Sequence, residues 1–99
     1  MEKYAASDLA KYVIQKHKDA EIGITNLRLQ KLLYYVQGYF LKKFDSPAFE
    51  EGIYRWAYGP VVVDVYYEYC SNGADDLPPP TNGEFENIEQ LVLPEHARL

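Results

Sequence analysis

Few side chains in this chain stand at spacings that would support catalysis or metal binding. The single cysteine, Cys70, has no histidine near it in the sequence, and His17 and His96 stand alone. The sequence contains no nucleophile-elbow serine and no Gly-rich loop after a strand, the usual marks of hydrolases and of phosphate-binding enzymes. These patterns predict a non-enzymatic protein with no cofactor and no metal.

Acidic residues form three close pairs. The pairs at residues 50–51 and 75–76 lie in polar stretches, where a solvated turn is the simpler interpretation. Asp64 and Glu68 share one face of a predicted helix, a spacing that suits a divalent metal only if further ligands converge. We interpret all three pairs as solvent-exposed, and we expect Cys70 to be a buried thiol.

Size and charge limit the class of protein. A chain of 99 residues makes one domain, and a net charge of -5 argues against a general binder of nucleic acid, whose affinity depends on Lys and Arg. One cysteine excludes an internal disulfide and is typical of a reducing compartment. No apolar run reaches the length of a membrane span. We therefore expect a cytoplasmic protein that makes no contact with the membrane.

The predicted fold is mainly α, a compact small helical domain with at most one short β element around residues 53–58. The helices are expected at residues 7–18, 25–44 and 60–72. Ser7 is the expected N-cap of the first, and Thr25 or Asn26 that of the second. Residues 61–63 are β-branched and favour a strand, but Pro60 suits the first position of a helix, and we predict the helix.

The second helix carries apolar residues on two faces. One face has the spacing of a core stripe: Leu29, Leu32, Leu33, Val36 and Phe40. The other face contains Leu27, Tyr34, Gly38 and Leu41. Such a helix is either central in its own domain or keeps one face for a partner. We predict the central position, between the first and third helices, with Gly38 marking a close approach.

Proline divides the chain into two parts. Residues 1–73 are the predicted helical core, and residues 74–99 are a proline-containing loop and a short C-terminal tail. The three prolines at 78–80 exclude a helix or a central strand at that point. One further short helix is compatible with residues 87–93.

Aromatic residues are unusually frequent, with ten tyrosines and one tryptophan. Rings that fill the core of a small domain, with their polar ends in water, account for part of them. Tyr and Trp are also enriched at the centres of protein interfaces. We therefore predict a partner-binding site that consists of Arg28, Lys31, Tyr34, Tyr35, Trp56, Tyr58 and Tyr67.

Several strings, at residues 24–38, 49–53, 56–62 and 65–66, carry a family resemblance. The most specific are Leu-Gln-Lys-Leu-Leu-Tyr and Tyr-Gly-Pro-Val. Together they resemble the Panacea domain, the antitoxin family that includes SocA-like and phage-associated proteins. The resemblance covers about residues 7–73. It implies a mainly helical bacterial or prophage protein that neutralises a cognate toxin by binding it, and its SocA branch delivers the toxin to the ClpXP protease.

The resemblance ends before the C-terminus. Members of the family usually continue through further helices, so we expect a shortened variant, a fragment, or a minimal core that forms a homodimer around Val63, Tyr67 and Cys70. The sequence is interpreted as an antitoxin-like binding module. The alternatives are a small enzyme, which needs a polar pocket, and a phage anti-defence or regulatory protein that binds operator DNA through a clustered Lys/Arg face.

Overall fold

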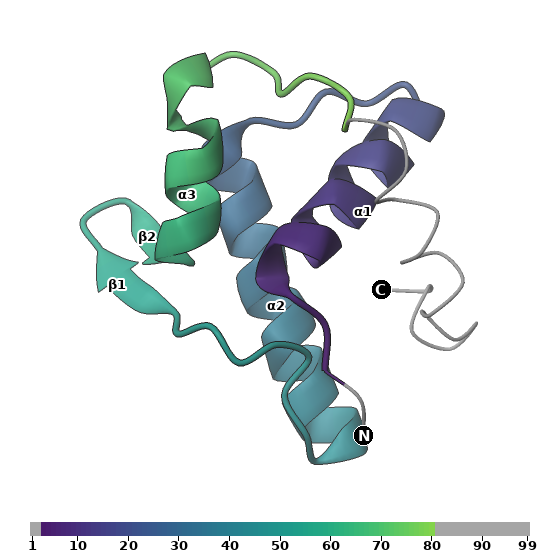
Figure 1. Cartoon of the computed structure of the whole chain (residues 1–99), viewed down its shortest axis with the longest axis vertical. Coiled ribbons are helices and arrows are strands. Elements are labelled where there is room, and N and C mark those ends of the chain that lie inside the picture. Colours follow the sequence, from purple (N-terminus) through teal and green to yellow (C-terminus); the bar gives the residue numbers. More distant parts are fainter. Residues whose placement is uncertain (1–2, 81–99) are drawn as a thin grey trace.

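Three helices and one β-hairpin make up the computed structural model, which describes residues 3–80 (Figure 1). The elements are α1 (Ala6–Asp19), α2 (Asn26–Phe44), β1 (Tyr54–Trp56), β2 (Gly59–Val61), α3 (Val63–Tyr69) and a 3₁₀ turn, η1 (Cys70–Asn72). The mainly α prediction is confirmed. α2 is the longest element, and α1, α3 and β2 all contact it. The helix considered for residues 87–93 lies outside the described residues.

α2 begins and ends where the sequence predicts. The Thr25 hydroxyl accepts a hydrogen bond from the Arg28 backbone N–H at 3.3 Å, which satisfies one of the donors that a helix start leaves free. At the other end Asp45 adopts a left-handed conformation with a φ of 52°. Lys42 and Lys43 lie in the last turn, where positive charge is favoured by the helix dipole. Local chemistry therefore fixes both ends of this helix.

α1, in contrast, has no side-chain cap from its own segment. It begins at Ala6, so the prediction that Ser7 is the N-cap is wrong. The Ala6 N–H donates to Glu51 Oε2 at 2.9 Å, and the Ser7 hydroxyl donates to Glu68 Oε1 at 2.8 Å. A carboxylate at a helix N-terminus is favoured by the helix dipole. The start of α1 is thus held by the loop before β1 and by α3.

The third helix is shorter than predicted, because it begins at Val63 and not at Pro60. Gly59–Val61 forms β2, which pairs antiparallel with β1 so that Trp56 lies opposite Gly59. Gly59 has a φ of 128°, a conformation that glycine adopts without strain, and this lets the chain reverse direction. A proline is tolerated in β2 because each strand of a two-stranded hairpin has a free edge.

The core lies where α1, α2 and α3 meet. The largest fully buried apolar side chains are Ile14, Ile24, Leu29, Leu33, Phe40, Phe49, Val61, Val62, Val65 and Leu77. The predicted core stripe of α2 is confirmed, since its remaining members Leu32 and Val36 are partly buried against this cluster. The Leu77 N–H donates to the Ile24 carbonyl at 2.8 Å, so the segment after η1 closes the core beside the α1–α2 turn (Figure 1).

The second apolar face of α2 remains exposed. Leu27, Tyr34 and Leu41 are each 49% exposed, and a Cβ built on Gly38 would meet nothing within 4 Å. The prediction that α2 packs on both faces, with Gly38 at a close approach, is therefore wrong. The reason is that α1 and α3 also contact each other, so both lie against the same side of α2.

Buried amides line one edge of α2 at the start of the helix. Gln30 Oε1 accepts a hydrogen bond from the Val62 N–H at 2.8 Å, and Gln30 Nε2 donates to Asn26 Oδ1 at 3.0 Å. Asn26 Nδ2 in turn donates to the Tyr66 carbonyl at 3.0 Å. Both amide side chains are almost fully buried. They satisfy polar groups at the junction of β2 and α3 that would otherwise lack partners.

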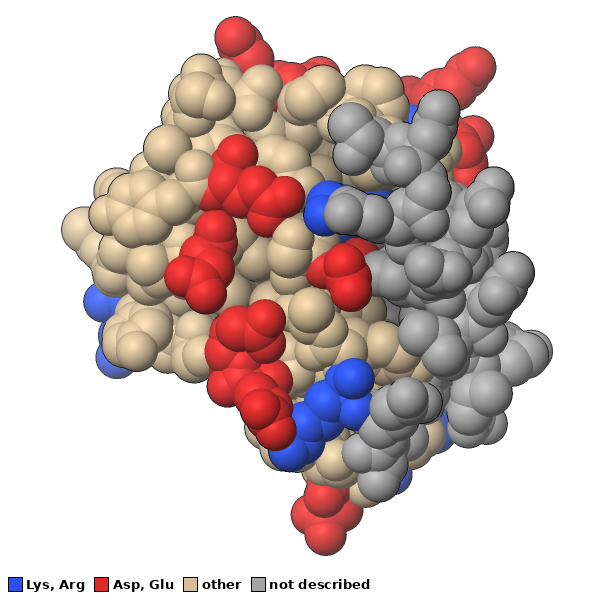
Figure 2. Space-filling view, in the orientation of Figure 1, with Lys and Arg blue, Asp and Glu red and all other residues tan. Residues whose placement is uncertain are grey.

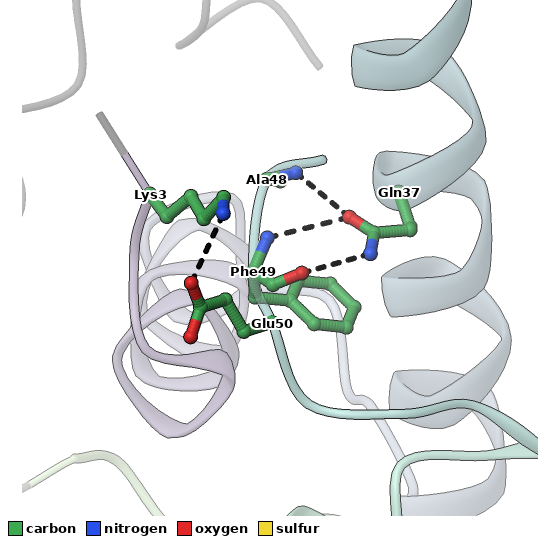
Figure 3. A network of polar contacts seen from close by, with 5 residues as sticks. All are labelled: Lys3, Gln37, Ala48, Phe49 and Glu50. Atoms are coloured by element: carbon green, nitrogen blue, oxygen red, sulfur yellow. Dashed lines mark hydrogen bonds and ion pairs between the residues drawn. The ribbon is translucent and has the colours of Figure 1, made fainter. Parts of the chain in front are cut away.

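Gln37 does the same for the loop before β1 (Figure 3). Its Oε1 accepts from the Ala48 N–H at 2.8 Å and the Phe49 N–H at 3.3 Å, and its Nε2 donates to the Phe49 carbonyl at 2.9 Å. These bonds place the Phe49 ring in the core. The ion pair of Lys3 with Glu50, 3.0 Å long, lies on the outside of the same loop and adds little stability.

We predict that Leu33→Asp leaves little folded protein. Leu33 is fully buried, and an unpaired buried carboxylate costs several kcal/mol, comparable to the ~5 to 15 kcal/mol that stabilises a typical domain. The control is Leu41→Asp on the exposed face of the same helix, which should melt within a few degrees of wild type. Soluble yield and thermal melts decide, and a Leu33→Asp protein as stable as the control would exclude Leu33 from the core.

Gln30→Leu tests the buried amides. The substitution leaves the Val62 N–H without an acceptor, and we expect it to lower the free energy of unfolding by about 2 kcal/mol or more. Gln15→Leu is the matched control, because within residues 3–80 the hydrogen bond of Gln15 is an exposed one to Asp19, and its loss should cost about 0.5 kcal/mol or less. Urea denaturation measures both. Equal stability of the two variants would contradict a structural role for Gln30.

Candidate partner-binding surfaces

The seven residues predicted to bind a partner fall into two groups in the structure. The first group lies on the exposed face of α2: Arg28, Lys31, Tyr34 and Tyr35. The second lies on the hairpin and α3: Trp56, Tyr58 and Tyr67. Helical period explains the first group, and the chain reversal at Gly59 brings the members of the second together.

The α2 group is both aromatic and basic. The rings of Tyr34 and Tyr35 lie 5.8 Å apart, and both side chains are about half exposed. Tyr39 extends this face toward the end of the helix, with the Lys43 ammonium 5.5 Å from its ring centroid. Rings that lie outside the core in this way are available to a partner, and ordering them on binding costs little rotamer entropy.

Trp56 is the centre of the second group, which we name the ring cluster and define as Trp56, Tyr58, Tyr66 and Tyr67. The Trp56 ring centroid lies 5.2 Å from that of Tyr66, 6.2 Å from Tyr58 and 6.3 Å from Tyr67, all in edge-on arrangements. Tyr58 and Tyr67 remain 57% and 62% exposed. The sequence prediction missed Tyr66, although its place beside Tyr67 in an aromatic run was a signal for it.

A hollow of about 290 Å³ lies between Leu27, at the start of α2, and the ring cluster. Leu27 of α2 lines one side, and Tyr58, Tyr66 and Cys70 line the other. The hollow thereby brings Leu27, an exposed residue of α2, close to Tyr58 and Tyr66 of the ring cluster. The mostly apolar walls of the hollow suit an apolar side chain of a partner.

The prediction that Cys70 is buried is wrong. Cys70 is exposed, not buried, because α3 ends before it and the 3₁₀ turn carries it to the rim of the hollow, where its thiol lies 3.4 Å from the Tyr67 carbonyl. Asp64 and Glu68 are exposed, as predicted, and Glu68 in addition accepts a hydrogen bond from Ser7 and lies 3.9 Å from the Lys11 ammonium. Within residues 3–80 there is no group of three or more side chains able to hold a metal ion.

Charge is unevenly distributed over the surface. Figure 2 shows acidic side chains as a band down the middle of one face, with few basic side chains among them. Three glutamates hold the N-terminal segment: Glu50 pairs with Lys3, Glu51 binds the Ala6 N–H, and Glu68 binds Ser7. Part of the acidic charge therefore contacts other residues of the chain and is not free for a partner.

The folded structure shifts the pKa of the Tyr66 hydroxyl. The pKa of Tyr66 is raised above its ordinary value of 10.0, and the largest cause is a hydrogen bond with the Tyr58 hydroxyl. Partial desolvation and electrostatic interactions with Tyr58, Cys70 and Tyr67 raise it further. The folded chain thus favours the protonated Tyr66 hydroxyl. The resulting contribution to stability is complete below about pH 10 and is lost as the pH rises through the folded-state pKa.

We predict that Tyr58→Phe lowers the pKa of Tyr66, because the hydroxyl that holds its proton is gone. The measurement is an alkaline titration of ¹³Cζ-labelled tyrosine by NMR, with the Tyr66 signal assigned from Tyr66→Phe. Tyr35→Phe, remote from this bond, should leave the Tyr66 titration unchanged. An identical Tyr66 midpoint in wild type and Tyr58→Phe would show that the two hydroxyls are not bonded.

Comparison with known proteins places these features in a family. The sequence model described as antitoxin SocA-like, Panacea domain, matches residues 29–93. The chain is 37% identical over 68 residues to a protein of Caulobacter vibrioides (strain NA1000 / CB15N) named antitoxin SocA, and the match covers 69% of this chain. The same match covers 36% of that relative, so the chain spans about a third of its length.

No solved structure matches the chain. None of the helices in the described part of the chain is both long and apolar enough to cross a membrane. The match over residues 29–93 includes most of α2, both strands, α3 and the ring cluster. The chain belongs to the Panacea-domain family of SocA-like antitoxins.

Proposed function

We propose that this chain neutralises a cognate toxin in the bacterial cytoplasm by binding it directly, without catalysis. Family membership supports an antitoxin-type role. The observation that supports direct binding is the exposure of aromatic side chains on two surfaces, the face of α2 and the ring cluster.

The exposed rings contribute little to the fold in their present positions. Tyr35 and Tyr67 are 58% and 62% exposed, so more than half of each side chain is left for a partner to cover. Trp56 is different, since it is partly buried and contacts three other rings. Trp56 therefore supports the cluster by packing against its other members, and the exposed tyrosines offer hydroxyls and ring edges to the toxin. This combination is typical of interface centres.

We expect Tyr35→Ala and Tyr67→Ala each to weaken toxin binding by about 2 kcal/mol or more, with little change in melting temperature. Trp56→Ala should weaken binding and also lower the melting temperature, because it removes the ring on which the cluster packs. Ile22→Ala is the control, since Ile22 is 57% exposed in the turn before α2 and lies outside both surfaces.

The experiment first identifies the toxin as a protein that co-purifies with the chain and stops growth when it is expressed alone. Rescue of growth by each variant is then compared with its thermal melt. Loss of rescue by folded Tyr35→Ala or Tyr67→Ala supports the proposal. Full rescue by both would exclude these surfaces, and a co-purifying protein that is harmless when expressed alone would overturn the antitoxin role.

The same cells separate two modes of neutralisation. The SocA-like family includes a branch that delivers its toxin to ClpXP, whereas occupation of the toxin's active surface needs no protease. We propose that the chain occupies the active surface of the toxin, because both of its exposed surfaces offer large side chains for direct contact. The amount of toxin should then stay constant when wild-type chain is added. A fall in toxin that depends on ClpX would show delivery instead.

A further inference from the structure

Gly38 has no structural purpose within the described fold. It lies in the middle of α2, where glycine destabilises a helix relative to alanine. A side chain at this position would meet nothing within 4 Å, so no packing inside the chain requires its absence. What glycine does leave at this point is a gap in the outer surface of the helix.

The gap lies within a regular row of exposed residues. The row consists of Leu27, Lys31, Tyr34, Gly38 and Leu41, all of them exposed. Their spacing alternates between four and three residues, which is the spacing of the contact seam in a two-helix coiled coil. We name this row the α2 seam. A second helix laid along it would contact each member, and its backbone could come closest at Gly38.

Charge indicates what kind of helix fits. α2 contains four basic residues, Arg28, Lys31, Lys42 and Lys43, and no acidic residue, although the chain as a whole carries -5. All four are exposed, and none of them forms an ion pair within residues 3–80. A partner with acidic residues beside its apolar stripe would complement this surface.

Two other occupants fit less well. A second copy of the chain would bring basic residues of one α2 against those of the other in either orientation, which like charges oppose. A nucleic acid would find Leu27, Tyr34 and Leu41 in the seam, between the cations that its phosphates need. The seam suits apolar side chains opposite Leu27, Tyr34 and Leu41, and carboxylates opposite Lys31 and the neighbouring Arg28.

We infer that the toxin docks through an acidic amphipathic helix that lies along the α2 seam and approaches the backbone of α2 most closely at Gly38. This inference rests on the proposed function and specifies the chemistry of the partner at that site. Apolar residues of the docking helix contact Leu27, Tyr34 and Leu41. Its carboxylates face Arg28 and Lys31.

The test uses the purified full chain and a displayed library of random helical peptides of roughly 20 residues, the length of α2. Enriched peptides should combine Asp and Glu with apolar residues at three- and four-residue spacing. Their binding, measured by fluorescence anisotropy, should weaken as NaCl is raised, because salt screens exposed charge pairs. Enrichment of neutral or basic peptides, or no enrichment, would overturn the inference.

Variants then locate the bound peptide. Arg28→Glu with Lys31→Glu should weaken the selected peptides roughly tenfold or more, while Lys16→Glu with Lys18→Glu on α1 changes the net charge equally and should leave affinity within about threefold. Gly38→Gln should also weaken binding roughly tenfold, because it holds the helices apart. Gly38→Ala should melt a few degrees higher than wild type and retain most of the affinity.

Other outcomes contradict the inference directly. A stable complex with a 20-base single strand or a duplex of DNA that Arg28→Glu with Lys31→Glu abolishes would assign the seam to nucleic acid. A dimer in light scattering that Gly38→Gln converts to a monomer would assign it to a second copy. Selected peptides that bind folded Gly38→Gln as tightly as wild type would place the contact elsewhere.

Failure of this inference is distinguishable from failure of the proposed function. Growth rescue by wild type together with full rescue by Gly38→Gln would retain the antitoxin role and exclude the seam. If acidic helical peptides bind the seam but no toxin is found for the chain, the seam would be retained as a docking site and the antitoxin role would be excluded.

Discussion

The fold depends on the amide side chains along one edge of α2. A buried backbone N–H or carbonyl must find a partner, and an amide is suited to this because it can donate and accept at once. Gln30 binds the junction of β2 and α3, and Gln37 binds the loop that carries Phe49 into the core. α2 is therefore the scaffold on which the hairpin, α3 and this loop are placed. These bonds help to fix the position of the ring cluster, together with the burial of Val61, Val62 and Val65.

This arrangement divides α2 lengthwise. One side is the core stripe, the next is the amide edge, and the rest is the exposed face with Tyr34 and Tyr35. A binding surface on a long, internally packed helix is presented rigidly, so a partner does not have to order it. The two apolar faces that the sequence predicts are both real, but only one of them is used inside the described fold. The other, with the hollow beside Leu27, is the candidate site.

Local chemistry determined how much could be predicted from sequence. The ends of α2 and its core stripe follow from Thr25, from helical period and from the turn at Asp45. The start of α1 and the hairpin were missed, because Glu51 caps from a distant loop and Gly59 reverses the chain where Pro60 favours a helix. The exposed tyrosines could be grouped by type and period. The placement of the hairpin and α3 on α2 could not be predicted, since it depends on buried amides whose contacts no periodicity reveals.

The contact of Glu51 with Ala6 has a consequence for the order in which the chain folds. It joins residues 45 positions apart, so the first turn of α1 gains its cap only after the chain has passed through α2 and returned. α2 carries its own cap at Thr25, three residues from the N–H that it binds. Closing a long loop costs entropy before the contact is made, whereas a local cap has almost none to overcome. We therefore expect the first turn of α2 to form before that of α1, whose cap needs the loop before β1 to be in place.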